Sequence, residues 1–176
     1  MRVCVYCASS ERIDALYRRL ATEVGARIAA DGHSLVSGGG RVSMMGDVAR
    51  AARAGGAHTL GVMPQSLVDT EIADVEADEL LVVASMRERK RLMDDNADAF
   101  LALPGGVGTL EELFEVWTSS YLGMHSKPVI VLDPFGFYEP LWAWLTSLRE
   151  TGFVSERALA GLHRAKSVDE AFHLLA

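Results

Sequence analysis

The segment "LPGGVGTLEE" (103–112) places three glycines, a threonine and two glutamates where an apolar run ends and a helical pattern begins. Glycines adopt positive φ readily and let a ligand approach the backbone closely. The first amides of a helix lack partners within the helix, and the helix dipole favours negative charge there. The segment therefore predicts a phosphate site. Its candidate residues are Gly105, Gly106, Val107, Gly108 and Thr109.

The acid at position 112 has two interpretations. Thr109 and Glu112 fit a capping box, with Thr109 as the N-cap and Glu112 at the third helical position. A cap contributes ~0.5–2 kcal/mol, which is sufficient reason for both residue types. A carboxylate beside a phosphate site also suits the hydroxyls of a ribose, or a water molecule. The two roles are compatible, and Glu111 is the neighbour expected to be more exposed.

A second unusual stretch, "MRERKRLM" (86–93), gathers Arg87, Arg89, Lys90 and Arg91 in an acidic protein. One interpretation is a solvated helix face whose cations pair with acids four residues later. The other is that one or two of these side chains reach an anionic ligand, because the planar guanidinium binds phosphate or carboxylate through two hydrogen bonds.

Composition narrows the classes of function. A net charge of −7 argues against general binding to nucleic acid or to a membrane surface. The apolar runs are shorter than the ~20 residues that a membrane span needs, so a cytoplasmic protein is expected. The pair Cys4 and Cys7 is interpreted as two buried residues on opposite faces of a strand, and no metal or cofactor is expected.

Apolar runs alternate with helical patterns along all 176 residues. Strands that are apolar on both faces and separated by helices predict a doubly wound, Rossmann-like parallel α/β sheet with helices on both faces, in a single domain over 1–176. Its ligand site should lie beyond the carboxyl ends of the strands. The polar segment 65–78 is a candidate lid. Expected strands are 2–8, 33–40, 58–64, 79–84, 99–104 and 127–133, and expected helices are 13–32, 42–56, 86–96, 109–123, 138–152 and 167–175.

Several motifs together resemble the Lonely Guy family, which older descriptions label lysine decarboxylase-like. They are "SGGGRVSMMGDVA" (37–49), "MRERK" (86–90) and "LPGGVGTLEELFEVWT" (103–118), supported by "VYCASS" (5–10) and "LGMHSKPVIVLD" (122–133). The family's PGGxGTxxE motif is complete, and the resemblance extends over nearly the whole chain.

The resemblance implies a Rossmann-like homodimer that hydrolyses the N-glycosidic bond of a nucleoside 5′-monophosphate, such as a cytokinin riboside 5′-monophosphate or AMP. The products would be the free base and ribose 5-phosphate. The family's catalytic residues fall on Arg89 and Glu112. Its ligand contacts, and other candidates near the motifs, fall on Glu79, Met86, Lys90, Gly39, Gly40, Glu111, Thr118 and the loop of Gly105 to Thr109.

The chain departs from the family pattern at three positions. Arg87 replaces the histidine of MHxRK, while Arg41 and Ser43 stand within the usual GGGSxGLMG. These changes put the preferred base in doubt and leave the reaction class intact.

Three other functions remain as alternatives. One is a nucleotide-binding or molybdenum-cofactor carrier protein without hydrolysis, which would need no catalytic pair. Another is a pyridoxal-phosphate decarboxylase, for which the chain offers only Lys90, Lys127 and Lys166. The last is a purely structural or interaction protein.

Overall fold

The computed structural model describes residues 1–68 and 73–175. Its seven strands form one parallel sheet in the order β4-β3-β2-β1-β5-β6-β7. The strands are β1 (Arg2–Tyr6), β2 (Ser34–Ser37), β3 (Thr59–Pro64), β4 (Glu79–Val83), β5 (Ala99–Ala102), β6 (Val129–Leu132) and β7 (His163–Ala165). The helices are α1 (Ala15–Ala30), α2 (Ser43–Ala54), α3 (Gln65–Val68), α4 (Met86–Asp95), α5 (Val107–Tyr121), α6 (Glu139–Glu150), α7 (Glu156–Ala160) and α8 (Val168–Leu175).

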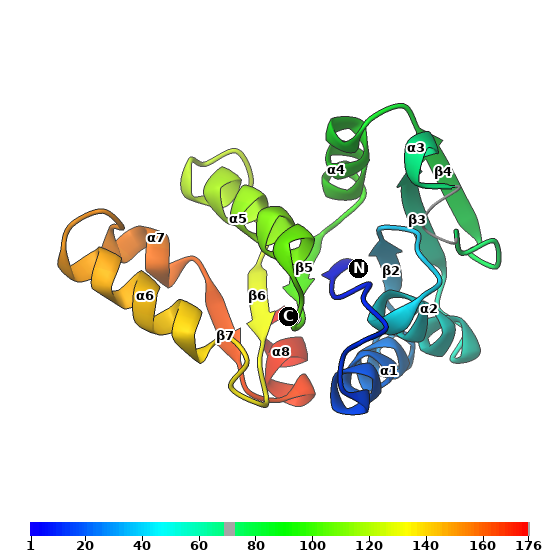
Figure 1. Cartoon of the computed structure of the whole chain (residues 1–176), viewed down its shortest axis with the longest axis horizontal. Helices are drawn as coiled ribbons and strands as arrows, with labels where there is room; N and C mark the ends of the chain where they lie inside the picture. The colour runs from blue at the N-terminus through cyan, green and yellow to red at the C-terminus, as the bar shows by residue number, and fades with distance from the viewer. Residues whose placement is uncertain (69–72, 176) are drawn as a thin grey trace.

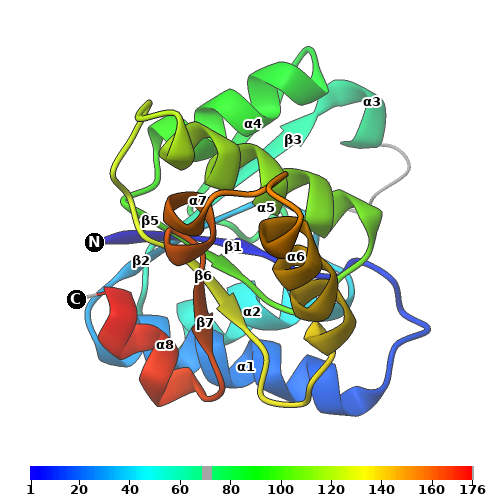
Figure 2. The same cartoon turned by 90° about the vertical axis from the view of Figure 1, so that its left-hand side faces the viewer.

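Helices cover both faces of this sheet, as the apolar strand pattern predicts (Figures 1 and 2). One buried cluster joins the sheet to α1, α2 and α8, and a second joins its other face to α4, α5, α6 and α7. Side chains alternate between the two clusters along each strand because successive Cβ atoms point to opposite faces. The doubly wound α/β fold is therefore confirmed.

The first strand illustrates this alternation. Cys4 belongs to the cluster under α5, whereas Cys7, just beyond the strand, belongs to the cluster under α1 and α2. Both cysteines are buried and free. The expectation that they occupy opposite faces is confirmed.

Three short elements were not expected from the sequence: α3, α7 and β7. The residues of β7 read "HRA", which lacks an apolar run because this strand lies at the edge of the sheet. The candidate lid 65–78 begins with α3, and its residues 69–72 lie outside the described residues. Beyond them, Ala73 forms an isolated bridge with Gly40. Among the helices of the described residues, none combines the length and apolar character needed to cross a membrane.

Candidate functional site

The site lies where the order of the strands reverses. The central strands β1 and β5 are neighbours, but β1 leads to α1 on one face of the sheet and β5 leads to α5 on the other. The two following segments therefore diverge and leave a crevice between them. A cavity of about 220 Å³ occupies this crevice. It is lined by Cys7, Ala8, Ser9, Ser10, Met45, Arg89, Gly106, Val107, Gly108, Thr109 and Glu112.

The first turn of α5 forms one wall of the cavity. The helix begins at Val107, and its N-cap, Gly106, has no side chain that could accept from the first amides. The earliest i−4 hydrogen bond of the helix joins the Leu110 amide to the Gly106 carbonyl, at 3.0 Å. The amides before Leu110 consequently have no i−4 carbonyl to bind, which suits an anion.

The capping-box interpretation of Thr109 and Glu112 is wrong. Because α5 begins at Val107, Thr109 is its third residue and Glu112 its sixth. Thr109 is buried against Gly105 instead, where a Cβ on the glycine would come within 2.1 Å of the Thr109 Oγ1. Glu112 therefore does not occupy the capping-box position.

The structural reason for glycine differs among the positions of this loop. Gly105 allows the close approach of Thr109, whereas a Cβ on Gly106 or Gly108 would meet no atom within 4 Å among the described residues. None of the three has a positive φ, so the loop does not use the left-handed backbone that glycine allows. The open space over Gly106 and Gly108 leaves their backbone accessible to a ligand.

Arg89 is a buried cation, with only 6% of its surface exposed. Its Nε donates to the Val62 carbonyl and its Nη2 to the Gly38 carbonyl, each at 3.0 Å. These two carbonyls belong to strand β3 and to the loop after β2. The guanidinium is therefore held at the carboxyl edge of the sheet in a fixed orientation.

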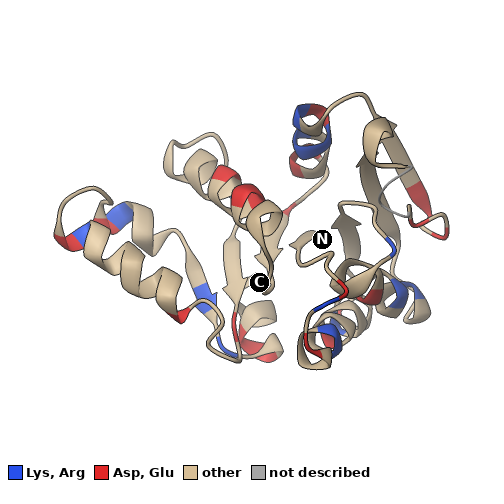
Figure 3. Ribbon diagram, viewed as in Figure 1, with Lys and Arg blue, Asp and Glu red and all other residues tan. Residues whose placement is uncertain are grey.

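Glu112 lies beside Arg89 in the lining of the cavity. Its Oε1 lies 3.7 Å from the Arg89 Nη1, and 12% of its side chain is exposed. The two elements that carry these side chains, α4 and α5, lie next to each other on the same face of the sheet (Figure 3). The structure thus brings together the two residues on which the catalytic candidates fell, beside the loop of Gly105 to Thr109.

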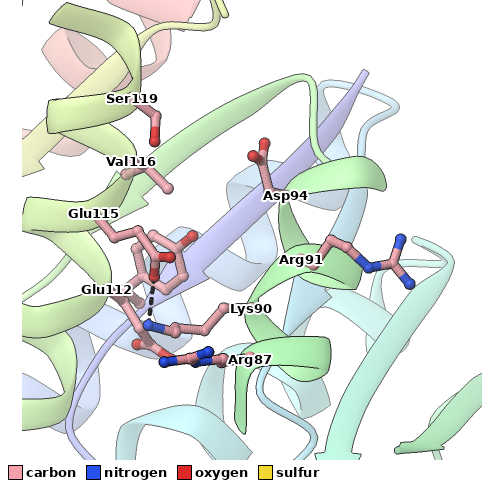
Figure 4. A pocket seen from close by; sticks show the side chains of 9 residues that line it. Arg87, Lys90, Arg91, Asp94, Glu112, Glu115, Val116 and Ser119 are labelled. Carbon is pink, nitrogen blue, oxygen red and sulfur yellow. Dashed lines mark ion pairs between the residues drawn. The ribbon is translucent and has the colours of Figure 1, made fainter. Parts of the chain in front are cut away.

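Lys90 and Glu111 pair with each other outside this cavity. The Lys90 ammonium contacts the carboxylates of Glu111 and Glu115, the latter at 2.5 Å. Burial opposes the charge, but the two carboxylates outweigh it and raise the pKa of Lys90 above its ordinary value. The basic residues of α4 therefore have different roles. Lys90 is paired with acids on the helix face, among them Glu115 (Figure 4), whereas Arg89 lines the cavity.

Other candidates lie apart from the pair of Arg89 and Glu112. Glu79 begins β4, at the amino edge of the sheet, and its carboxylate lies 3.4 Å from the His58 ring. Thr118 lines a separate apolar hollow near the end of α5. Met86 is exposed at the start of α4. The remaining two, Gly39 and Gly40, do not line the cavity and lie beside Leu80 and Met45 respectively.

The loop after β1 was not among the candidates. Cys7 to Ser10 line the cavity opposite α5, and the signal was present in "VYCASS", which ends a central strand at the carboxyl edge of the sheet. Burial, then the nearby Glu112 carboxylate, raises the pKa of the Cys7 thiol. This thiol stays protonated near neutral pH and is a poor nucleophile.

Ser43 joins this loop to α2. Its Oγ donates to the Ser10 carbonyl at 2.6 Å, and its φ of 51° is the only positive value for a non-glycine among the described residues. Such backbone strain persists only where surrounding contacts impose it. Two residues later, Met45 lines the cavity. The departure from the family pattern at Ser43 therefore lies next to the cavity, bonded to one lining residue, Ser10, and two positions before another, Met45.

Comparisons with known proteins identify relatives of this chain. Residues 45–175 match a family model described as "Possible lysine decarboxylase". A Mycobacterium marinum protein named cytokinin riboside 5′-monophosphate phosphoribohydrolase is 52% identical over 174 residues, covering 99% of this chain and 92% of that protein. An Arabidopsis thaliana protein with this name, LOG2, is 40% identical and covers 99% of this chain and 82% of its own length.

Solved structures show the same fold at lower identity. A molybdenum cofactor binding protein from Rippkaea orientalis superimposes with a TM-score of 0.75 at 22% identity, covering 99% of this chain and 94% of that chain. A molybdenum cofactor carrier protein from Chlamydomonas reinhardtii gives a TM-score of 0.73 at 22% identity, covering 99% and 96%. At this identity the likeness concerns the fold alone.

Proposed function

Since the chain belongs to the Lonely Guy family, whose model carries the description "Possible lysine decarboxylase", we propose that it is a phosphoribohydrolase. It hydrolyses the N-glycosidic bond of an adenosine 5′-monophosphate, including N6-modified forms such as cytokinin riboside 5′-monophosphates. The products are the free base and ribose 5-phosphate. The observation that carries this proposal is the buried Arg89 facing Glu112 beside the first turn of α5.

The phosphate binds to the first amides of α5. Gly106 and Gly108 leave open space there, and the helix dipole favours the negative charge. Glu112, one turn farther along the helix, then faces the ribose. The substrate is fixed at one end while its reacting carbon lies beside a carboxylate.

Cleavage of the glycosidic bond builds positive charge on the sugar ring. The Glu112 carboxylate stabilises this charge and orients or deprotonates the attacking water. Glu112 takes the proton from the water, the bond electrons leave with the base, and the base takes up a proton to become the free base. An arginine side chain does not serve as a base, so Arg89 acts by positioning the ligand and stabilising the departing base.

The variant Glu112→Gln tests the catalytic role of Glu112, and a variant of the neighbouring acid Glu111 serves as the comparison. We expect adenine release from AMP to fall by about a hundredfold or more, because the amide carries no negative charge. Glu111→Gln serves as the matched control, since the Glu111 carboxylate binds Lys90 and does not line the cavity. Free adenine is quantified by chromatography, and Arg89→Ala is expected to lose activity to a similar degree.

Full activity of Glu112→Gln would contradict the mechanism. If the wild-type protein binds AMP and releases no adenine, the carrier alternative is correct instead. A panel of 5′-monophosphates and the matching nucleosides also measures how far turnover depends on the phosphate.

The lysines do not favour the decarboxylase chemistry in the family's description. A Schiff-base lysine needs a lowered pKa, whereas the pKa of Lys90 is raised. Lys127 donates to the Asp94 carbonyl at 2.7 Å and to its carboxylate at 2.5 Å. These contacts suit structural roles for both side chains.

We propose further that the chain works as a single-domain homodimer. Support comes from the family resemblance and from large apolar side chains exposed after α5 and α6, including Met124 (75% exposed) and Phe153 (84%). Phe153 and Tyr121 also line one hollow. Sedimentation should give twice the chain mass, and Phe153→Glu should shift it toward the monomer. A monomeric wild-type protein would contradict this proposal.

A further inference from the structure

The turn between β6 and α6 lies at the same edge of the sheet as the loop after β5. The two strands are parallel neighbours, so both connections leave the carboxyl edge. In the turn, the buried Asp133 carboxylate accepts from the Phe137 amide at 2.8 Å and from the Tyr138 amide at 2.9 Å. Tyr138 is also buried, with 2% of its surface exposed. These contacts fix the backbone that carries the Tyr138 ring.

The Tyr138 hydroxyl binds the first residue beyond β5. Pairing between β5 and β6 extends to Ala102 and Val131. Leu103, the next residue, is fully buried, and its carbonyl accepts from the Tyr138 hydroxyl at 2.7 Å. A buried carbonyl needs a hydrogen-bond donor, and a side chain supplies it here, where the strand pairing has ended.

The Tyr138 phenol also lies close to Gly105. Burial raises the pKa of this phenol and the Asp133 carboxylate raises it further, whereas hydrogen bonding from the Gly105 backbone lowers it. The phenol therefore stays protonated near neutral pH and keeps its proton for the Leu103 carbonyl. It thus contacts two backbone groups of the connection that leads to α5.

Hydrogen bonds hold this connection from both sides. On the β1 side, the Leu103 amide donates to the Tyr6 carbonyl at 2.8 Å, and the Ala8 amide donates to the Pro104 carbonyl at 3.3 Å. On the β6 side, the contact is the Tyr138 hydroxyl. An apolar cavity of about 240 Å³ borders the connection, and its lining includes Pro104, Gly105, Gly106 and Phe137. This open space lets the backbone shift when one of the hydrogen bonds is lost.

We infer that Tyr138 is a positioning residue for the phosphate site. It does not line the cavity at Arg89 and Glu112. It acts through the backbone of residues 103–105, which leads directly to Gly106, the N-cap of α5. Amide donors bind an anion well only when supporting hydrogen bonds hold them in the productive geometry. The inference rests on the proposed position of the phosphate at the first turn of α5.

The variant Tyr138→Phe tests this role, because it keeps the ring and removes the hydroxyl. Calorimetry well below the unfolding temperature of the variant compares its affinities for ribose 5-phosphate and for adenosine, which lacks the phosphate. The affinity for ribose 5-phosphate should fall by roughly tenfold, and that for adenosine should stay nearly unchanged. A purely structural role would lower the unfolding temperature and leave both affinities unchanged.

Tyr17→Phe is the matched control. The Tyr17 ring lines the same apolar cavity and packs against Phe137, with 5.8 Å between the ring centroids. Within the described residues its hydroxyl makes no hydrogen bond, so removal of this hydroxyl should change neither affinity.

A second variant, Asp133→Asn, tests the same contacts from the turn. Asparagine lacks the charge and one of the two acceptor oxygens that bind the Phe137 and Tyr138 amides. The affinity for ribose 5-phosphate should therefore fall by about two- to threefold, with adenosine again unchanged.

Unchanged ribose 5-phosphate affinity in Tyr138→Phe, or in Asp133→Asn should the first variant fail to fold, would overturn the inference. Equal losses for adenosine would overturn it as well. A wild-type protein that binds ribose 5-phosphate and releases no adenine from AMP would instead contradict the proposed function, while the affinities would still test Tyr138.

Discussion

Two glycine-rich loops follow parallel strands in this protein, one after β2 and one after β5, and they serve opposite purposes. In the loop after β2, the protein itself fills the space around each glycine. A Cβ on Gly38 would come within 1.8 Å of the Arg89 Nη2, Gly39 has a φ of 76°, and a Cβ on Gly40 would come within 2.9 Å of the Met45 Sδ. In the loop after β5, Gly106 and Gly108 face open space.

The difference shows that equal composition does not imply an equal role. The glycines after β2 let a buried arginine approach the backbone and let the chain form a tight turn. The open glycines after β5 leave their backbone accessible to a ligand. Substitutions in the first loop should therefore act through Arg89 and protein stability, and those in the second through ligand affinity.

Gly38→Ala is the change with the largest expected effect. The new methyl group displaces the Arg89 guanidinium from the Gly38 carbonyl and from Glu112. We expect kcat/KM for AMP to fall by about a hundredfold or more. The free energy of unfolding should fall by about 1–3 kcal/mol, because a buried cation loses an acceptor.

A double-mutant cycle with Arg89→Ala measures whether Gly38 acts through Arg89. Once the guanidinium is removed, alanine at position 38 should cost almost nothing more in activity. Additive losses would mean that Gly38 has a separate role and would break the comparison between the loops.

Gly108→Ala should separate affinity from stability in the other loop. Its backbone is helical and its Cβ position is open, so alanine should stabilise the fold by up to about 1 kcal/mol. The methyl group would occupy the ligand's space, and we expect the affinity for ribose 5-phosphate to fall by roughly tenfold. Thermal unfolding and calorimetry measure the two quantities. Unchanged affinity would show that the ligand does not use this space.

Substitutions of Ser43 should have the smallest effect on stability. They test the strain in the residue that follows the loop after β2. Ser43→Gly removes the strain of positive φ and the hydrogen bond to the Ser10 carbonyl, whereas Ser43→Ala removes only the hydrogen bond. We expect the glycine variant to exceed the alanine variant by about 1 kcal/mol in the free energy of unfolding. Equal values from denaturant titrations would mean that the left-handed backbone costs little here.

Much of the fold follows from local sequence patterns, which can be recognised without knowing the tertiary contacts. Apolar strands such as β5 and β6, and amphipathic helices such as α5, were predicted within about two residues at most boundaries. The start of α5 was misplaced because Thr109 and Glu112 have capping-box spacing, while the helix begins directly after Gly106. Strand β7 was missed because its three residues at the sheet edge carry no apolar pattern.

By itself, the sequence determined the alternation of strands and helices, the glycine-rich composition of the loop after β5, and the residue types of the pair that we propose to be catalytic. Only the tertiary structure decided which of four neighbouring cations reaches the site. Arg89 does so because carbonyls from β3 and from the loop after β2 lie where α4 crosses them. These contacts join residues 27 and 51 positions apart, and pairings at that separation depend on how the sheet is assembled rather than on any local pattern.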